Sequence, residues 1–220
     1  MLKLNNFIMK KELFIFYNIL TALLILSFLS ILQGQPTKDY NSCFEQLVHK
    51  YSGVTSISFR FKSTDMSDMR GKISAEKGNK YYLELLDRTI VCDSKTLWNF
   101  SKPDKKLIIS NFEGDDNKES SIEQFFFNFL KSYKPVSLTE ESSSRGKTST
   151  VLKLIPSENK QGVKYLMLYL SKNYDIHSVS FFDGKKFQTW DVNDVVLNKK
   201  FPKNYFEFNP PENTTVIDLR

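Results

Sequence analysis

Short apolar segments follow one another at close spacing along most of this chain, and only a few turn-forming residues separate them. In the first segment, Ile57, Phe59 and Phe61 alternate with polar residues, which is typical of a strand with one buried face. Connections this short leave no room for a crossover helix, so we expect neighbouring strands to run antiparallel. The expected strands are residues 56–62, 70–76, 80–86, 88–92, 96–100, 107–112, 148–155, 164–171, 177–182, 186–196 and 205–208.

Two segments have a helical period instead. The first begins where Ser42 and Glu45 are spaced as a capping box, and it ends at Gly53. The second spans residues 121–134 and ends before Pro135, because proline cannot continue a helix. Its apolar stripe is the clearest helical pattern in the chain and consists mostly of phenylalanine.

Several expected strands are apolar on both faces. In residues 165–170, tyrosine and methionine occupy one face and leucine occupies the other. A sheet with one face in water would alternate cleanly between polar and apolar residues, so both faces of this sheet need a covering. The sheet could curl and enclose its own core, with the helices covering the remainder. Alternatively, it could enclose an apolar cavity that has the phenylalanine-rich helix as its lid.

The cavity alternative gives a set of candidate residues for binding an apolar ligand. The expected lid residues are Ile122, Phe125, Phe126, Phe129 and Leu130. The expected wall residues are Phe59, Phe61, Tyr81, Leu83, Trp98, Phe100, Met167, Tyr169 and Phe181. A shift of one residue in a strand would exchange its inner and outer sets.

The chain contains none of the common motifs for acyl transfer, nucleotide binding or zinc binding. His49 lies off the apolar stripe of the first helix, which favours a solvated surface position, and His177 has no nucleophile at a recognisable motif spacing. Cys43 and Cys92 are too few for a disulfide framework or a zinc site. They could pair in an oxidising compartment, although two buried thiols are the simpler interpretation. We therefore expect no enzymatic activity, no catalytic residues, no cofactor and no metal site.

The charge balance is only mildly basic, with 31 Lys and Arg against 25 Asp and Glu. Removing the first 35 residues takes away Lys3, Lys10, Lys11 and Glu12, which leaves 28 basic and 24 acidic residues. This excess is too small, and too poorly interleaved with aromatic residues, to indicate nucleic-acid binding. A hydrophobic content of 40% also excludes a disordered chain and a polytopic membrane protein.

The first 35 residues have the order of an export signal. Lys10 and Lys11 precede an apolar run at residues 13–32, and the small residue Gly34 follows it. We expect cleavage near Gly34, which leaves residues 36–220 as one exported domain, in the periplasm if the source has two membranes. The run is long enough to span a bilayer, so it could instead be retained as an anchor. Cys43 lies too far beyond the run for lipid attachment.

Two motifs point to a known family. Residues 91–100, VCDSKTLWNF, resemble the V-S-D-G-K-T-L-W-x-Y hairpin of the LolA family of periplasmic lipoprotein carriers. Residues 206–218, FEFNPPENTTVID, resemble the F-x-F-x-P-P-x-G-x-x-V-x-D ending of that family. The order of export signal, helix, strands, lid helix and further strands also fits. The resemblance covers nearly all of the chain after residue 36.

The resemblance implies an incomplete antiparallel β-barrel of roughly ten or eleven strands, closed by a helical lid over an apolar cavity. It implies a carrier that takes lipoproteins by their acyl chains from an inner-membrane ABC-type release complex to an outer-membrane lipoprotein receptor. We expect a monomer. A sensor or adaptor of the same fold, anchored or soluble, is the alternative.

One family feature is altered in this chain. The family has an Arg-Pro pair after its second strand, and that arginine hydrogen-bonds the lid. Lys77 and Gly78 occupy the matching positions. Lysine keeps the positive charge but lacks the planar donor fork of arginine, so Lys77 is the candidate lid latch in a modified form.

Overall fold

A computed structural model describes residues 39–66, 68–112, 127–142, 148–158 and 162–220. These residues belong to one compact unit, Asp39–Arg220. The expected export segment and the expected lid residues Ile122, Phe125 and Phe126 lie outside the described residues. In the part of the chain that the structure describes, no helix combines the length and apolarity that a membrane span requires.

Helix α2 (Tyr40–Ser52) opens this unit, as expected, but its cap differs from the predicted one. Asp39 is the N-cap residue, and its carboxylate accepts a hydrogen bond of 2.9 Å from the backbone N–H of Asn41. The prediction of a capping box that begins at Ser42 is therefore wrong. Gly53 ends the helix, as predicted, and it does so with an ordinary φ of −88°.

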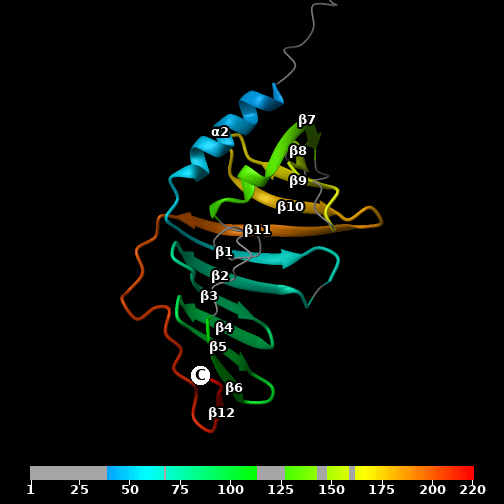
Figure 1. The fold of residues 1–220 in the computed structure, drawn as a ribbon. Coiled ribbons are helices and arrows are strands. Elements are labelled where there is room, and N and C mark those ends of the chain that lie inside the picture. The colour runs from blue at the N-terminus through cyan, green and yellow to red at the C-terminus, as the bar shows by residue number, and fades with distance from the viewer. Residues whose placement is uncertain (1–38, 67, 113–126, 143–147, 159–161) are drawn as a thin grey trace, which may run out of the picture. The chain divides into compact units, whose positions relative to one another are not determined.

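A single sheet forms the rest of the unit (Figure 1). Its strand order is β12-β6-β5-β4-β3-β2-β1-β11-β10-β9-β8-β7. Within the described residues the end strands β12 and β7 do not pair, so the sheet is open and the predicted incomplete barrel is confirmed. The bounds are β1 Ser56–Ser63, β2 Arg70–Glu76, β3 Lys80–Leu85, β4 Arg88–Asp93, β5 Thr96–Ser101, β6 Lys106–Asn111, β7 Tyr133–Ser142, β8 Thr148–Pro156, β9 Tyr165–Leu170, β10 Ile176–Phe182, β11 Phe187–Leu197 and β12 Thr215–Asp218.

Ten of the twelve strands agree with the predicted ones to within about two residues. The prediction is wrong at two places. Strand β7 begins at Tyr133, where a helix was expected, and Pro135 lies inside it. Proline is tolerated there because β7 is an edge strand, which needs no second row of backbone hydrogen bonds. Residues 205–208 form a turn and an extended segment rather than a strand, and the last strand is β12, parallel to β6.

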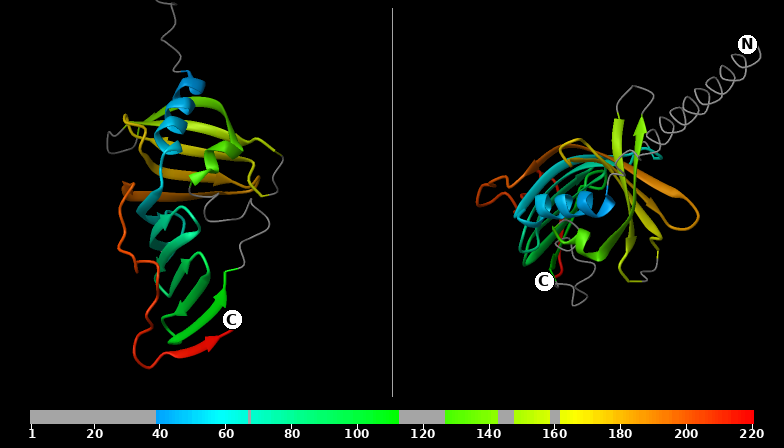
Figure 2. Two further views of the ribbon diagram at one scale, coloured as in Figure 1. Left: turned by 60° about the vertical axis from the view of Figure 1, so that its left-hand side comes forward. Right: turned by 90° about the horizontal axis from the view of Figure 1, so that it is seen from above.

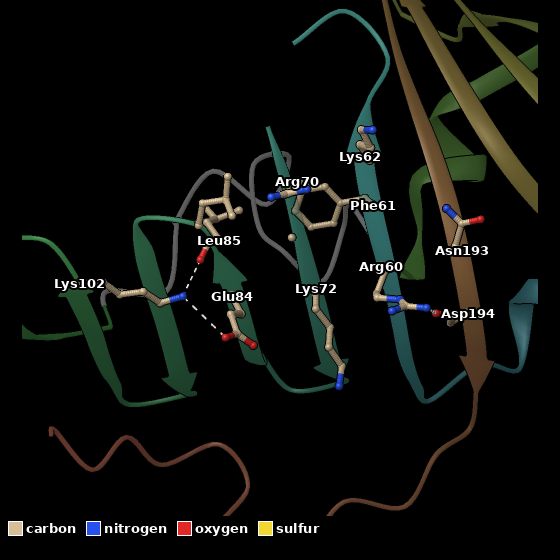
Figure 3. Close-up of a pocket in the computed structure, with 12 residues that line it drawn as sticks. Arg60, Phe61, Lys62, Arg70, Lys72, Glu84, Leu85, Lys102, Asn193 and Asp194 are labelled. Atoms are coloured by element: carbon tan, nitrogen blue, oxygen red, sulfur yellow. Dashed lines mark hydrogen bonds and ion pairs between the residues drawn. The ribbon is translucent and has the colours of Figure 1, made fainter. Parts of the chain in front are cut away.

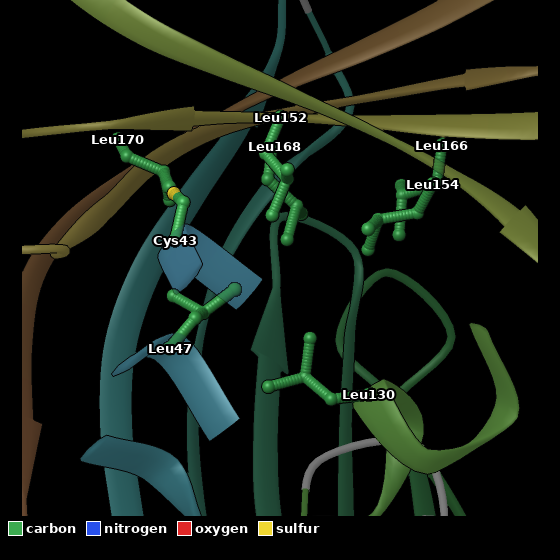
Figure 4. Packing of buried hydrophobic residues seen from close by; sticks show 8 residues of the cluster. All are labelled: Cys43, Leu47, Leu130, Leu152, Leu154, Leu166, Leu168 and Leu170. Atoms are coloured by element: carbon green, nitrogen blue, oxygen red, sulfur yellow. The ribbon is translucent and has the colours of Figure 1, made fainter. Parts of the chain in front are cut away.

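The face of the sheet on which α2 lies is called the inner face here (Figure 2). At one end of it, α2 and the 3-10 helix η1 (Phe129–Ser132) pack against strands β8 and β9. The buried members of this first cluster are Cys43, Leu47, Leu130, Leu152, Leu154, Leu166, Leu168 and Leu170 (Figure 4). Burying this many leucine side chains contributes about 2 kcal/mol each before the entropy cost of folding is counted.

A second cluster covers the inner face of strands β1 to β4. Its buried members are Val54, Ile57, Ala75, Tyr81, Cys92 and Phe127. Tyr51, at the end of α2, packs against both clusters and so links them.

The extended segment that follows β11 runs along the opposite, outer face of β2 to β5 and packs against part of it (Figure 1). The Tyr205 hydroxyl lies 3.0 Å from Ser74 Oγ, and its ring centroid lies 5.9 Å from that of Tyr82. The rings of Phe208 and Phe100 are 5.4 Å apart. These contacts cover the apolar outer-face side chains Tyr82 and Phe100 without a second helical layer.

Candidate functional site

Cross-strand pairing arranges the inner face of β1 to β4 in rows, because directly opposed residues in an antiparallel sheet share a face. The first row is fully covered: Ala75, Tyr81 and Cys92 are buried beneath Val54 and Phe127. The rows beyond it are only partly covered, and this surface is called the apolar site. Its half-buried members are Phe59, Phe61, Leu83, Leu85 and Ile90, with the buried Ile73 between Phe59 and Leu83.

The apolar site is contiguous across four strands. Phe59 pairs with Ile73, Ile73 with Leu83, and Leu83 with Ile90. The Phe59 and Phe61 rings are in edge contact, with centroids 6.3 Å apart. A continuous aromatic and aliphatic surface that is only half-buried is the kind of surface to which an apolar ligand binds.

Four of the expected wall residues, Phe59, Phe61, Tyr81 and Leu83, are brought together in or beside the apolar site. Phe181 also lies on the inner face, but it packs against the first cluster.

The other four expected wall residues lie on the outer face, so the expected common wall is wrong for them. Trp98 pairs with Val91 and Phe100 pairs with Thr89, both on the outer face. In β9 the leucines face inward, and Met167 and Tyr169 pair with the outer-face residues Ser180 and Ser178. Apolarity alone could not distinguish the faces, because aromatic contacts such as Phe100 with Phe208 cover the outer one.

In its described part, the segment expected to form the lid helix has a different secondary structure from the predicted one. The predicted helix does not continue to residue 134, because Phe129–Ser132 is a 3-10 turn and Tyr133 starts a strand. Leu130 is 6% exposed in the first cluster, and Phe129 packs against the same cluster.

Phe127 lies off the predicted stripe, and among the described residues of this segment it is the one that covers the second cluster. It is 9% exposed, and the Lys77 ammonium lies 6.0 Å from its ring centroid. An ammonium at this distance from an aromatic ring is attracted by about 0.5–1 kcal/mol at a surface site. The run of three phenylalanines, Phe125-Phe126-Phe127, could have indicated that Phe127 is buried. The assumption of a regular helix instead placed Phe127 off the buried stripe.

His177 has a partner that its sequence position did not reveal. Its Nε2 atom lies 3.1 Å from Ser149 Oγ, across strands β10 and β8. Ser149 shares the outer face with Val151, so this pair is on the side of the sheet opposite the apolar site. His49 is exposed in α2, as predicted. Among the described residues, no group of three or more His, Cys, Asp and Glu side chains could hold a metal ion.

The two cysteines are free thiols, each buried in a different cluster. Burial raises the pKa of the Cys92 thiol to about 11, because the charged thiolate would be poorly solvated.

We therefore predict that Cys92 resists thiol reagents in the folded protein. With a pKa of about 11, about one thiol in a thousand is ionised at pH 8, and only the thiolate reacts. A Cys43→Ala variant leaves Cys92 as the single thiol, and its labelling by a disulfide reagent is followed spectrophotometrically. Labelling should be slow in buffer and fast in urea. Equally fast labelling in both would contradict the burial of Cys92.

Similar folds occur among solved structures. An uncharacterized conserved protein from Thermus thermophilus has 15% sequence identity and a TM-score of 0.51, and the match covers 81% of this chain and 98% of that chain. A LolA superfamily protein from Nitrosomonas europaea, NE2245, has 14% identity and a TM-score of 0.34, with 78% of this chain and 98% of that chain covered. The first of these likenesses shows a shared fold.

Sequence comparison gives a finer assignment. Uncharacterized protein MJ0687 of Methanocaldococcus jannaschii is 28% identical over 151 residues, which cover 68% of this chain and 43% of the relative. The chain thus spans less than half the length of that relative. The model of the family described as outer membrane lipoprotein carrier protein LolA matches residues 52–209, from the end of α2 to the segment after β11. The chain therefore belongs to the LolA family.

Proposed function

We propose that this protein is a carrier that shields the acyl chains of lipoproteins on its apolar site. In this proposal the chain is exported by its N-terminal segment and acts in a periplasm. It receives cargo from an inner-membrane ABC-type release complex and delivers it to an outer-membrane lipoprotein receptor. The observation that supports this most directly is the half-buried row formed by Phe59, Leu83 and Ile90.

The apolar site matches the energetics of such a carrier. An acyl chain in water costs about 0.8 kcal/mol per CH₂ group, so cargo must lose most of its apolar surface to water-free contacts. A partly open surface can supply those contacts without the interlocked packing that would prevent release. Because the sequence contains no nucleotide-binding motif, cargo release in this proposal depends on a receptor whose apolar site binds the acyl chains more tightly.

Phe127 would act as a movable cover at the edge of the apolar site, and its displacement would extend the site by the first row. It closes the first row, and its contact with Lys77 is a weak one that links the β2–β3 hairpin to the segment before η1. Displacing Phe127 without cargo would expose an aromatic ring and the row beneath it. Opening would therefore be unfavourable until an acyl chain replaces those contacts.

We predict that Phe59→Glu combined with Leu83→Glu weakens acyl-chain binding at least tenfold. Each carboxylate would have to lose its hydration against the ligand, and a tenfold loss corresponds to only about 1.4 kcal/mol. The measurement is the uptake of a fluorescent fatty acid by purified protein, together with mass spectrometry of co-purifying lipoproteins. The double variant with alanine at the same positions, which removes contact area without adding charge, serves if the glutamate variant does not fold.

Val196→Glu is the matched control. Val196 of β11 pairs with Ser58 of β1 on the outer face of the sheet and is 47% exposed. This variant should bind the probe like the parent protein. Uptake that survives both double variants would remove the apolar site as the binding surface.

A further inference from the structure

The outer face of β1 and β2 carries cations in an unusual arrangement. Arg60 is directly opposite Lys72, and Lys62 is directly opposite Arg70, so two like-charge pairs are neighbours on one face. Directly opposed like charges destabilise a sheet, because their side chains are close enough to repel. Such an arrangement becomes favourable when an anion lies between the cations.

These cations border an open pocket of about 630 Å³ (Figure 3). Its floor includes Phe61, Gly71 and Leu85, at paired positions of three neighbouring strands. A Cβ atom at Gly71 would lie 2.4 Å from the backbone oxygen of Glu84, so no larger residue fits at this point of the floor.

Only part of the positive charge is matched within the protein. Arg60 forms an ion pair with Asp194, and Lys102 Nζ lies 3.6 Å from Glu84 and donates a 2.6 Å hydrogen bond to the Leu85 carbonyl (Figure 3). Lys62 is directly opposite Asp191 of the neighbouring strand β11.

Arg70 and Lys72 are exposed, and within the described residues neither forms an ion pair. The pocket lining as a whole has five cations against two carboxylates. It therefore presents unmatched donors to a ligand from solution.

Apolar side chains lie next to these cations. Met66 and Met69, in the connection from β1 to β2, are 45% and 47% exposed, and Met69 directly precedes Arg70. Exposed cations beside exposed, flexible apolar side chains are typical of a surface that lies in the headgroup region of a bilayer. A free phosphate or an acidic protein would account for the cations but not for the methionines.

We propose that the pocket and the adjacent methionines dock the protein on a bilayer surface, with anionic phospholipid headgroups between the cations of β1 and β2. The cations lie on the outer face and the apolar site lies on the inner face, although Phe61 and Leu85 border both. Substituting the cations alone therefore tests docking without changing the apolar side chains that would bind an acyl chain. Docking by this surface holds the carrier at a membrane while its inner face stays available to cargo.

The test uses residues 36–220, because both hydrophobic clusters lie within Asp39–Arg220 and the apolar run before it would bind bilayers by itself. Co-sedimentation with vesicles of phosphatidylglycerol and phosphatidylcholine is compared with vesicles of phosphatidylcholine alone. The parent protein should bind the anionic vesicles, and this binding should weaken with salt. Lys62→Gln, Arg70→Gln and Lys72→Gln together should reduce the affinity roughly a hundredfold, at about fivefold per cation near an anionic surface.

A triple variant with the same charge change elsewhere is the matched control. Lys95→Gln, Lys172→Gln and Lys203→Gln replace exposed lysines outside the pocket and should leave vesicle binding within about twofold of the parent. Met66→Ser with Met69→Ser should weaken vesicle binding while the pocket cations remain. Fatty-acid uptake by the pocket variant should equal that of the parent, which separates this proposal from the proposed carrier function.

Three results would overturn the proposal. The first is equal vesicle binding by the parent and the pocket variant. The second is binding of inorganic phosphate or glycerol 3-phosphate with no binding of anionic vesicles, which would indicate a site for a soluble anion. The third is binding of polyglutamate but not of vesicles, which would indicate an acidic protein partner.

Discussion

Leu168→Ala is expected to lower the free energy of unfolding by about 3 kcal/mol, because it removes a fully buried side chain from the first cluster. Leu168 is 0% exposed, and on the inner face it pairs with Leu152 and Val179. Leu47 of α2, also 0% exposed, belongs to the same cluster. The surrounding strands are fixed by their ladders and cannot collapse into the cavity left behind. Urea unfolding, followed by circular dichroism, measures the loss.

Met167→Ala is the matched control for this substitution. Met167 is the preceding residue, is half-buried, and pairs on the outer face with Lys153 and Ser180. We expect a loss of less than about 1 kcal/mol, because truncation there leaves no enclosed cavity. Equal losses for Leu168→Ala and Met167→Ala, or a larger loss for Met167→Ala, would show that the faces of β9 are assigned the wrong way round.

Gly71→Ala is expected to destabilise the sheet by about 3 kcal/mol, although it adds a single methyl group. The new Cβ would lie 2.4 Å from the Glu84 carbonyl oxygen, 2.8 Å from Phe61 Cζ and 2.9 Å from Leu85 Cδ2. The first of these neighbours is backbone, so β2 and β3 would have to separate to make room. Thermal unfolding measures the effect directly, and the reduced order of the Phe61 ring should be visible in the near-ultraviolet circular dichroism.

Gly53→Ala provides the comparison. No atom lies within 4 Å of a Cβ built at Gly53, and its φ of −88° is accessible to alanine. We expect a change within about 0.5 kcal/mol, or a small gain because alanine reduces the freedom of the unfolded chain. If Gly71→Ala were equally harmless, the close approach of β2 and β3 at this position would be excluded.

Local sequence signals predicted most strands because each depends on a few neighbouring residues. The bounds of β2, Arg70–Glu76, are the predicted ones, and the turn after it has Gly78 and Asn79 at positive φ angles of 91° and 60°. Glycine and asparagine are the residues that adopt this conformation most readily, so the turn can be identified from composition alone. The antiparallel order followed from the shortness of such turns.

The faces of the strands could not be predicted in the same way. In β9 both faces are apolar, and in β5 the aromatic residues Trp98 and Phe100 lie on the outer face. The face is decided by partners far away in the sequence, as Phe208 is for Phe100. The covered row beside the apolar site depends on Phe127, which lies off the helical stripe that the sequence predicted. Spacings of three and four residues at Phe126, Phe129, Leu130 and Tyr133 fit a helix, but Leu130 and Tyr133 meet the same cluster from a 3-10 turn and a strand. Only tertiary packing separates these possibilities.

Parallel pairing of β12 with β6 has a consequence for how safely the chain can fold. Val216 and Ile217 are opposite Leu107 and Ile108, so β12 covers an edge that is rich in leucine and isoleucine. Until β12 arrives, that edge presents unpaired backbone groups to any other chain that meets it. The segment after β11 must first pass strands β1 to β6, and β12 is the last strand of the chain, so this protection comes late. Crowded or slow folding would therefore favour intermolecular strand addition at β6, and a prompt arrival of the last strand limits aggregation.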